Sequence, residues 1–286
     1  MASIRALDGV FLAWGETARW DDARQRLYCV DCATHVLGWL EGGEPPLHTM
    51  AMPSMPTGAA LATDGRLVVA LDGGLHVVDV DAGSLELLAP YPNGLGDRAN
   101  DLNADGEGNL VTGTLNLADG PGSYWWYSAT EGWRLLDDDG IGNANGPVVL
   151  DLAGRRSLVF ADTRANRLYA YAYEGRGGQV GPRRVFADTA GAGGSPDGAC
   201  ADAAGGVWSC LLGPGRLVRY QTEGETDTIE VGVSLPSDVT FGGPDLATMF
   251  VTTIASGPDP ASAEGGQVFA VENSGFRGLP EPRFSL

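Results

Sequence analysis

The chain has 286 residues, of which 43% are hydrophobic, 43 are glycine and 17 are proline. Hydrophobic content at this level is enough for a large core and excludes a disordered chain. The chain carries 37 acidic and 18 basic residues and a formal charge of −19, so we expect no nucleic acid or anionic membrane surface as a partner. All 18 basic residues are arginine, which excludes mechanisms that need a lysine base or Schiff base.

The N-terminal segment has one short apolar run, Val10–Trp14. Five residues are too few for the apolar region of a signal peptide and far too few for a membrane span. The sequence therefore predicts a cytoplasmic protein, in which cysteines stay reduced. We expect the four cysteines to be buried thiols and not zinc ligands. Cys29 and Cys32 have the spacing of a metal knuckle, but they lie in a predicted strand, where the first and fourth residues point to opposite faces. Cys200 and Cys210 do not have the spacing of a zinc site.

Short apolar segments that follow turn residues recur along the chain at intervals of 40 to 49 residues. A period in this range, with several strands in each repeat, is typical of a β-propeller. The frequent glycines and prolines suit a tight turn after each short strand. No long segment has an apolar period of 3.6 residues, so we expect almost no helix. The recurring segments are Arg26–Val30, Arg66–Ala70, Asn109–Thr112, Ser157–Ala161, Gly206–Cys210 and Thr248–Thr252.

A second apolar strand follows in several repeats, at Leu75–Val80, Arg167–Tyr171, Gly215–Tyr220 and Gly266–Val271. Six repeats of about four strands account for the length of the chain. The sequence therefore predicts an all-β, six-bladed β-propeller. A closed ring of repeats cannot be divided without exposing strand edges, so we expect residues 1–286 to form a single domain.

Polar residues stand at the start of the predicted inner strands. Glu16 follows Trp14-Gly15, Asn145 precedes Gly146-Pro147 and an apolar run, and Asp197 lies in a Pro-Asp-Gly turn. Two carboxylates and an amide without thiolate or imidazole form the kind of ligand set that Ca²⁺, Mg²⁺ or Mn²⁺ prefers. The alternative is that these are ordinary turn residues, because Asn-Gly-Pro and Pro-Asp-Gly also form turns.

Two other patterns do not indicate function. The segment Asp101–Gly106 begins like a calcium-binding EF-hand loop, but Thr112 occupies the position where a bidentate glutamate is needed. We interpret the segment as a hairpin turn. The three histidines lack a nearby carboxylate in the sequence, and we expect them to be structural or exposed: His35, His48 and His76.

The chain resembles the regucalcin, gluconolactonase and luciferin-regenerating-enzyme family of six-bladed propellers over nearly its whole length. The resemblance implies that Glu16, Asn145 and Asp197 bind a divalent metal. It also implies that Arg98 and Asn100 face the substrate, with Asp101 orienting them from behind. The matching segments are Leu12–Glu16, Trp20–Asp22, Leu27–Asp31, Arg98–Asp101, Gly113-Thr114, Asn145–Pro147, Phe160–Thr163, Pro196–Gly198, Val207-Trp208, Phe241–Leu246, Val251–Thr253 and Gly278–Phe284.

The chain departs from the family pattern at three places. Thr17-Ala18 follows Glu16, where family members usually have Gly-Pro. No acidic residue follows Gly113-Thr114 before Asp119, where many sugar-lactone enzymes carry a substrate contact; the aromatic run Tyr124–Tyr127 comes next, and we assign it to strand packing. The loop Ile254–Glu264 looks short. These departures concern specificity for a polyhydroxylated sugar more than catalysis.

The sequence predicts a metal-dependent lactonase in which Asp197 also serves as the general base and Ca²⁺ is the expected metal, with Mg²⁺, Mn²⁺, Zn²⁺ and Fe²⁺ as the other candidates. The substrate would be a small lactone, and the protein a monomer or weak homodimer. One alternative is a non-catalytic propeller that binds calcium or a ligand. Another is a hydrolase of a different ester or of an organophosphate.

Overall fold

The computed structural model describes residues 2–93, 95, 98–115, 120–257 and 263–286. It contains six sheets of four or five strands, and the described helices are two 3₁₀ turns, η1 (Arg176–Gly178) and η2 (Ala190–Ala192). The prediction of an all-β, six-bladed propeller with almost no helix is confirmed. No described helix has the length and apolar character needed to cross a bilayer.

The chain divides into two compact units, which we describe separately. Unit 1 comprises residues 1–56 and 197–281, and unit 2 comprises residues 57–196 and 282–286. The strand Ser195–Ala201 begins two residues before unit 1 and is described with it. The single-domain organisation therefore stays a prediction.

Unit 1 contains three sheets in which strands that follow one another in the sequence pair antiparallel. The first is β2 (Gly15–Asp21), β3 (Arg26–Asp31), β4 (Val36–Glu41) and β5 (His48–Ala51); the second is β19 (Ser195–Ala201), β20 (Val207–Leu212), β21 (Arg216–Gln221) and β22 (Gly224–Glu230); the third is β23 (Pro236–Gly242), β24 (Thr248–Thr253), β25 (Phe269–Glu272) and β1 (Ser3–Ala6).

Unit 2 contains the other three sheets. One has β6 (Gly58–Ala62), β7 (Leu67–Leu71), β8 (Gly74–Asp79), β9 (Ser84–Pro90) and β26 (Arg283–Phe284); the next has β10 (Arg98–Ala104), β11 (Leu110–Leu115), β12 (Gly122–Ser128) and β13 (Gly132–Ile141); the last has β14 (Ala144–Leu152), β15 (Arg155–Asp162), β16 (Arg167–Glu174), β17 (Gln179–Val180) and β18 (Arg184–Asp188).

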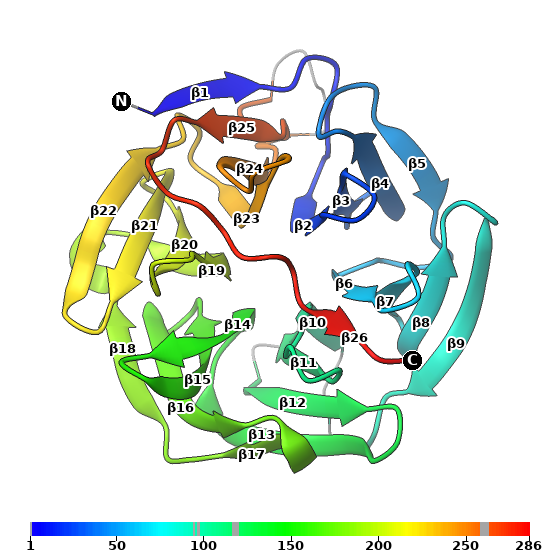
Figure 1. Cartoon of the computed structure of the whole chain (residues 1–286), viewed down its shortest axis with the longest axis vertical. Helices are drawn as coiled ribbons and strands as arrows, with labels where there is room; N and C mark the ends of the chain where they lie inside the picture. The colour runs from blue at the N-terminus through cyan, green and yellow to red at the C-terminus, as the bar shows by residue number, and fades with distance from the viewer. Residues whose placement is uncertain (1, 94, 96–97, 116–119, 258–262) are drawn as a thin grey trace. The chain divides into compact units, whose positions relative to one another are not determined.

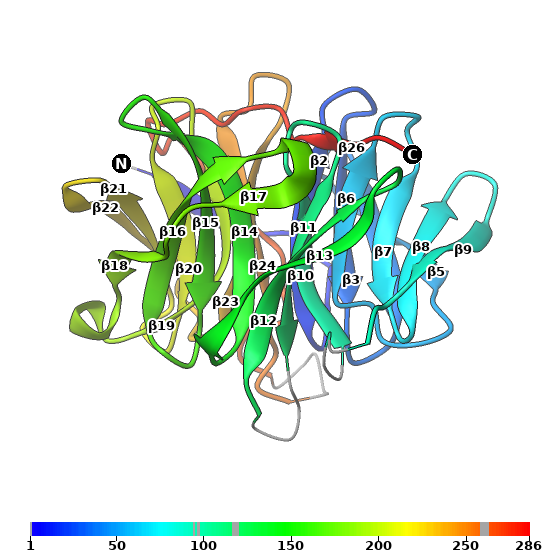
Figure 2. The same cartoon turned by 90° about the horizontal axis from the view of Figure 1, so that it is seen from below.

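Each end of the chain joins a sheet that is built from a distant part of the sequence. In unit 1, β1 pairs antiparallel with β25, with Ser3 opposite Glu272, as Figure 1 shows. In unit 2, β26 pairs parallel with the end of β6, with Arg283 opposite Leu61, and Figure 2 shows β26 next to that end. Both pairings cover a strand edge that would otherwise be open to association with another chain.

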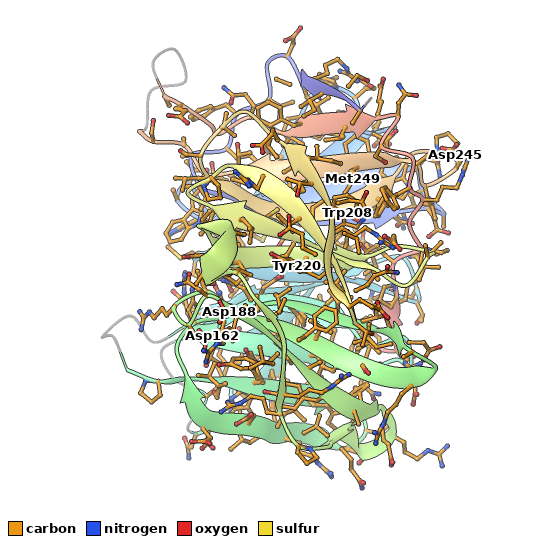
Figure 3. The ribbon with its side chains drawn as sticks, turned by 90° about the vertical axis from the view of Figure 1, so that its left-hand side faces the viewer. Asp162, Asp188, Trp208, Tyr220, Asp245 and Met249 are labelled. Atoms are coloured by element: carbon orange, nitrogen blue, oxygen red, sulfur yellow. The ribbon has the colours of Figure 1, made fainter. Side chains whose placement is uncertain are left out.

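All six strands predicted from the repeat are confirmed as the second strand of a sheet, namely β3, β7, β11, β15, β20 and β24. They form because short, β-branched and apolar runs bury both faces. Their side chains fill separate clusters in each unit: Trp208 and Met249, labelled in Figure 3, belong to a cluster of unit 1. In unit 2 the run Tyr124–Tyr127 lies within the fully buried strand β12, which agrees with its assignment to strand packing.

Candidate metal and substrate site

The predicted site residues lie near the start of the first strand of four sheets. Glu16 is the second residue of β2 and Asn145 the second residue of β14, while Asp197 is the third residue of β19 and Asn100 the third residue of β10. The sequence analysis therefore located each residue correctly within its repeat. Their combination into one site stays a prediction.

Glu16 and Asn145 both lie at a β-bulge. The pairing of β2 with β3 shifts register between Glu16 and Arg19, and the pairing of β14 with β15 shifts between Asn145 and Val148. A bulge leaves an extra residue unpaired and turns the neighbouring side chains away from the regular alternation, which is common beside active sites. The residue after each of these predicted ligands has a left-handed backbone conformation, with φ of 54° at Thr17 and 52° at Gly146.

In unit 1, neighbouring residues hold the side chain of Glu16 and the backbone just before it. The indole nitrogen Nε1 of Trp14 donates to Oε1 of Glu16 at 3.0 Å. The carboxylate of Asp31 accepts the backbone N–H groups of Ala13 at 2.8 Å and Trp14 at 3.0 Å. Asp31 therefore fixes the chain where it enters β2, two residues before the predicted ligand.

The two predicted carboxylate ligands share one region of unit 1 with the buried thiol of Cys210. Burial raises the pKa of Cys210 well above its ordinary value, and the negative charges of Asp238, Asp197 and Glu16 add to this effect. A thiol with a raised pKa stays protonated at neutral pH and is a poor metal ligand. Cys210 is therefore not expected to bind a metal.

In unit 2, an amide pair joins the predicted substrate contact to the predicted ligand. Nδ2 of Asn100 donates to Oδ1 of Asn145 and to the carbonyl of Ala144 at 3.1 Å. Nδ2 of Asn145 donates to Oγ1 of Thr163 at 2.8 Å. Because the nitrogen of the Asn145 amide donates to Thr163, its oxygen faces Asn100. Oxygen is the amide atom that can bind a hard cation.

Asp162 and Asp101 hold the backbone around Asn145. The carboxylate of Asp162 accepts the N–H groups of Gly142 at 2.9 Å and Asn143 at 3.1 Å. Oδ2 of Asp101 accepts the N–H of Gly146 at 2.9 Å. Asp101, predicted to orient site residues from behind, thus contacts the residue that directly follows the predicted ligand.

Arg98 begins β10 and is only 6% exposed, whereas Asn100 is half-buried. A buried guanidinium can make charge-assisted hydrogen bonds that are stronger than those of an exposed one. This placement suits the predicted role of Arg98 in substrate binding.

In the described part of the chain, no three histidine, cysteine, aspartate or glutamate residues come together as a potential metal group. The predicted ligand set contains only two such residues, Glu16 and Asp197, and its third member is the amide of Asn145. All three offer oxygen, and this donor chemistry fits a hard divalent cation.

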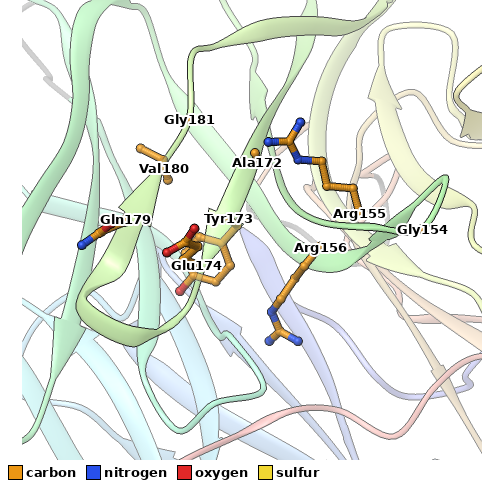
Figure 4. Close-up of a pocket in the computed structure, with 9 residues that line it drawn as sticks. All are labelled: Gly154, Arg155, Arg156, Ala172, Tyr173, Glu174, Gln179, Val180 and Gly181. Carbon is orange, nitrogen blue, oxygen red and sulfur yellow. The ribbon is translucent and has the colours of Figure 1, made fainter.

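A groove in unit 2 lies away from the predicted residues. It has a volume of about 430 Å³, and Figure 4 shows it between β15, β16 and β17, with Arg155, Arg156, Tyr173 and Glu174 among its lining residues. Arg156 is already engaged, because its Nη2 donates to the carbonyl of Asp105 at 2.6 Å. None of the predicted site residues lines this groove.

The sequence analysis gave no role to Asp31 or Asp162, although the structure shows that they hold equivalent turns. Each ends the second strand of its sheet and accepts two N–H groups just before a predicted ligand. A signal was present, since Val30-Asp31 and Ala161-Asp162 both place an aspartate after an apolar strand at the same repeat position. Residues 116–119, which bear on the missing acidic substrate contact, and 258–262 of the loop Ile254–Glu264 lie outside the described residues.

Comparison with known proteins identifies the family. The family model described as SMP-30/Gluconolactonase/LRE-like region matches residues 14–255. The chain belongs to this family. The resemblance inferred from the sequence is therefore confirmed. At the level of the family, the prediction of a hydrolase that acts on carboxylic esters is confirmed as well.

Several relatives in the family match almost the whole chain. Pentonolactonase XacC of Haloferax volcanii is 31% identical over 88% of this chain and 86% of its own length. The 6-deoxy-6-sulfogluconolactonase of Pseudomonas putida is 31% identical over 95% of this chain and 94% of its own. A solved regucalcin from Agrobacterium tumefaciens, described as a calcium-binding protein, is 28% identical, covers 99% of this chain and 98% of its own, and has a TM-score of 0.87.

Proposed function

We propose that this protein is a metal-dependent lactonase that opens the ring of a small lactone, with a sugar lactone as the first candidate. Glu16, Asn145 and Asp197 would bind the metal, and Arg98 and Asn100 would bind the substrate. The observation that carries the proposal is that each predicted ligand stands at the start of the first strand of its sheet. Hydrogen bonds hold the side chains of two of them, Glu16 and Asn145. Relatives of known name support the substrate class, since several are lactonases.

The oxygen donors of the three proposed ligands suit Ca²⁺ first, and also Mg²⁺ or Mn²⁺. When bound, such a cation polarises the lactone carbonyl and stabilises the negative charge that develops on its oxygen. A relative described as a calcium-binding protein supports the choice of Ca²⁺ as the first metal to test.

Asp197 would act as the general base. Its carboxylate takes a proton from the attacking water while the water oxygen bonds to the carbonyl carbon. The bond between that carbon and the ring oxygen then breaks, and the proton returns to the ring oxygen, which leaves a hydroxy acid. Asp197 is 4% exposed, and burial of this kind strengthens its electrostatic interaction with groups in the site.

Arg98 would hold the substrate through charge-assisted hydrogen bonds to its oxygens, and Asn100 would contact a ring or hydroxyl oxygen. The amide of Asn100 already contacts Asn145, so a substrate placed at Asn100 would lie beside a proposed ligand. Positioning of this kind lowers the entropic part of the barrier.

The proposal is tested by acid release from a panel of aldonolactones and simple aliphatic lactones, with and without a chelator. We expect hydrolysis of at least one lactone, loss of activity with the chelator, and recovery on adding Ca²⁺ or Mn²⁺. The variant Asp197→Ala should fold but lose both metal binding and hydrolysis. Full activity in this variant, or in the chelated enzyme, would contradict the proposal.

A second candidate is a propeller that binds calcium or a ligand without catalysis. It is favoured by the absence of an acidic residue between Thr114 and Asp119 in the sequence. Metal binding without turnover of any lactone in the panel would identify this case.

A further inference from the structure

Unit 1 contains an internal counterpart of Asp101, namely Asp238 on β23. In each case one carboxylate oxygen accepts the N–H of the next residue at 2.8 Å, Leu102 for Asp101 and Val239 for Asp238. In each case a threonine of the neighbouring strand donates its hydroxyl to the backbone carbonyl of the aspartate. The two aspartates therefore occupy equivalent positions of the repeat.

The second oxygen of Asp238 holds the bulge that follows Glu16. Oδ2 of Asp238 accepts the N–H of Ala18 at 2.9 Å and Nη1 of Arg19 at 2.7 Å. The same nitrogen of Arg19 donates to the carbonyl of Ala18 at 2.8 Å. The peptide groups on both sides of Ala18 are thus tied to one buried ion pair, in which Arg19 is 2% and Asp238 1% exposed.

The bulge is also held on its other side. The hydroxyl of Ser237, the neighbour of Asp238, donates to the carbonyl of Gly15. Ser237 is fully buried. Contacts from two successive residues of β23 therefore lie on either side of Glu16, one at the residue before it and one at the second residue after it.

Asp238 also packs against the strand that carries Asp197. A methyl group built on Gly198 would lie 2.5 Å from Cγ of Asp238 and closer still to its Oδ1. No side chain fits at that distance, so the absence of one at Gly198 lets β19 approach the carboxylate directly. Asp238 consequently touches the residue that follows Asp197 as well as the segment that follows Glu16.

We propose that Ser237 and Asp238 are positioning residues that hold Glu16 and Asp197, the two carboxylates of the proposed metal site, in the geometry for binding. This inference rests on the proposed function, but the residues and contacts that carry it lie within unit 1. Groups behind the ligands orient them, and their loss commonly weakens metal binding by about 10- to 100-fold.

A second buried ion pair of unit 1 supplies a matched control. Nε of Arg219 lies 2.6 Å from Oδ2 of Asp202, with exposures of 5% and 0%. Asp202 follows the far end of β19, five residues after Asp197, which corresponds to about 16 Å along a strand. Replacing Asp202 therefore disturbs a comparable buried charge pair without touching either proposed ligand.

The experiment compares Asp238→Asn with Asp202→Asn. An amide has a single acceptor oxygen, so the side chain in Asp238→Asn could not accept from both Val239 and the Ala18–Arg19 pair. We expect similar losses of thermal stability in the two variants, but a Ca²⁺ affinity at least tenfold weaker in Asp238→Asn and within about twofold of wild type in Asp202→Asn. Affinity is measured by calorimetric titration with Ca²⁺ alone and repeated with Mn²⁺ alone.

A kinetic readout separates positioning from general instability. Lactone hydrolysis by Asp238→Asn should recover toward the wild-type kcat as Ca²⁺ is raised, whereas Asp202→Asn should need no added metal. Ser237→Ala keeps both charges and loses the hydroxyl that bonds to Gly15 and Thr252. It should weaken Ca²⁺ binding by about threefold, and it remains informative if Asp238→Asn does not fold.

The positioning role would be overturned if Asp238→Asn and Asp202→Asn bind Ca²⁺ with equal affinity. If Asp238→Asn is unfolded, equal Ca²⁺ affinities for Ser237→Ala and wild type would overturn it. Either result would leave the lactonase proposal intact. A wild-type protein that binds neither metal and hydrolyses no lactone would overturn both.

Discussion

The bulge at Glu16 in unit 1 and the bulge at Asn145 in unit 2 are built alike but carry different chemistry. In each, an aspartate of the second strand fixes the preceding turn, and the residue after the predicted ligand has a positive φ. The carboxylate of Glu16 accepts an indole N–H, and its bulge is tied to a buried ion pair. The amide of Asn145 is held by neutral groups, Thr163 and Asn100.

The two bulges therefore share a backbone conformation that the repeat provides. They differ in the charge of the side chain at the bulge, which depends on the individual residue. The unit 1 bulge presents an anion, and the unit 2 bulge presents a neutral oxygen. If both bind one cation, the anionic member should contribute more to affinity, because its Coulomb attraction adds to the coordination bond.

The largest expected effect tests that ranking. Glu16→Ala should lower kcat/KM for lactone hydrolysis by about a thousandfold, or ~4 kcal/mol, and Asn145→Ala by about a hundredfold, or ~3 kcal/mol. The measurement is initial rates at saturating Ca²⁺ and a parallel titration of metal affinity. The exposed Glu223 provides a control, and Glu223→Ala should behave as wild type. A larger loss in Asn145→Ala than in Glu16→Ala would reverse the comparison.

A smaller effect is expected from the hydroxyl that orients Asn145. Thr163→Val removes the acceptor for Nδ2 of Asn145, so the amide can rotate and Ca²⁺ affinity should fall by about tenfold. Thr163→Ser keeps the acceptor and should stay within about twofold of wild type. Equal affinities for the Val and Ser variants would show that Asn145 does not need this bond.

The residues that follow the two predicted ligands, Thr17 and Gly146, allow opposite changes in stability to be tested. Thr17 is β-branched at φ 54° and its buried hydroxyl has no partner among the described residues, so Thr17→Gly should stabilise the protein by about 1 kcal/mol. Gly146→Ala, at φ 52°, should destabilise it by about 1–2 kcal/mol.

Denaturant midpoints measure both changes. Thr17→Ala separates the two contributions at Thr17, because it removes the hydroxyl but keeps the positive φ. If Thr17→Gly is less stable than wild type, backbone strain at Thr17 does not distinguish the bulge at Glu16 from the bulge at Asn145.

The smallest expected effect is a loss of stability at alkaline pH that arises in unit 1. All four cysteines are buried and lie in residues assigned to this unit. Burial, and then the charge of Asp31, raises the pKa of Cys29 to about 12, against about 8.5 for a free thiol. Between these values the unfolded chain loses a proton that the folded chain keeps, so unfolding free energy falls as pH rises above about 8.5 and is unaffected below it. Cys29→Ala should flatten this fall in denaturant titrations from pH 8 to pH 10, and an unchanged slope would contradict the assignment.

Much of the fold could be predicted because its signals are local. The six strands represented by Arg26–Val30 and its counterparts are apolar runs bounded by turn residues, and their period alone indicates a propeller. The candidate ligands could also be identified from the sequence, because Glu16, Asn145 and Asp197 precede those strands at matching places in the repeat. Strand pattern and turn chemistry depend on near neighbours, so one sequence suffices to detect them.

The tertiary structure decided what surrounds those residues. The hydrogen bond from Ala18 to Asp238 joins positions 220 residues apart, and the requirement for glycine at position 198 arises from a carboxylate on another strand. The bulges next to Glu16 and Asn145 depend on the register between paired strands. Such contacts arise from how strands pack, and no periodicity along the chain encodes them. The sequence alone therefore identified the candidate ligands and Asp101, but it gave no role to Asp31, Asp162 or Asp238.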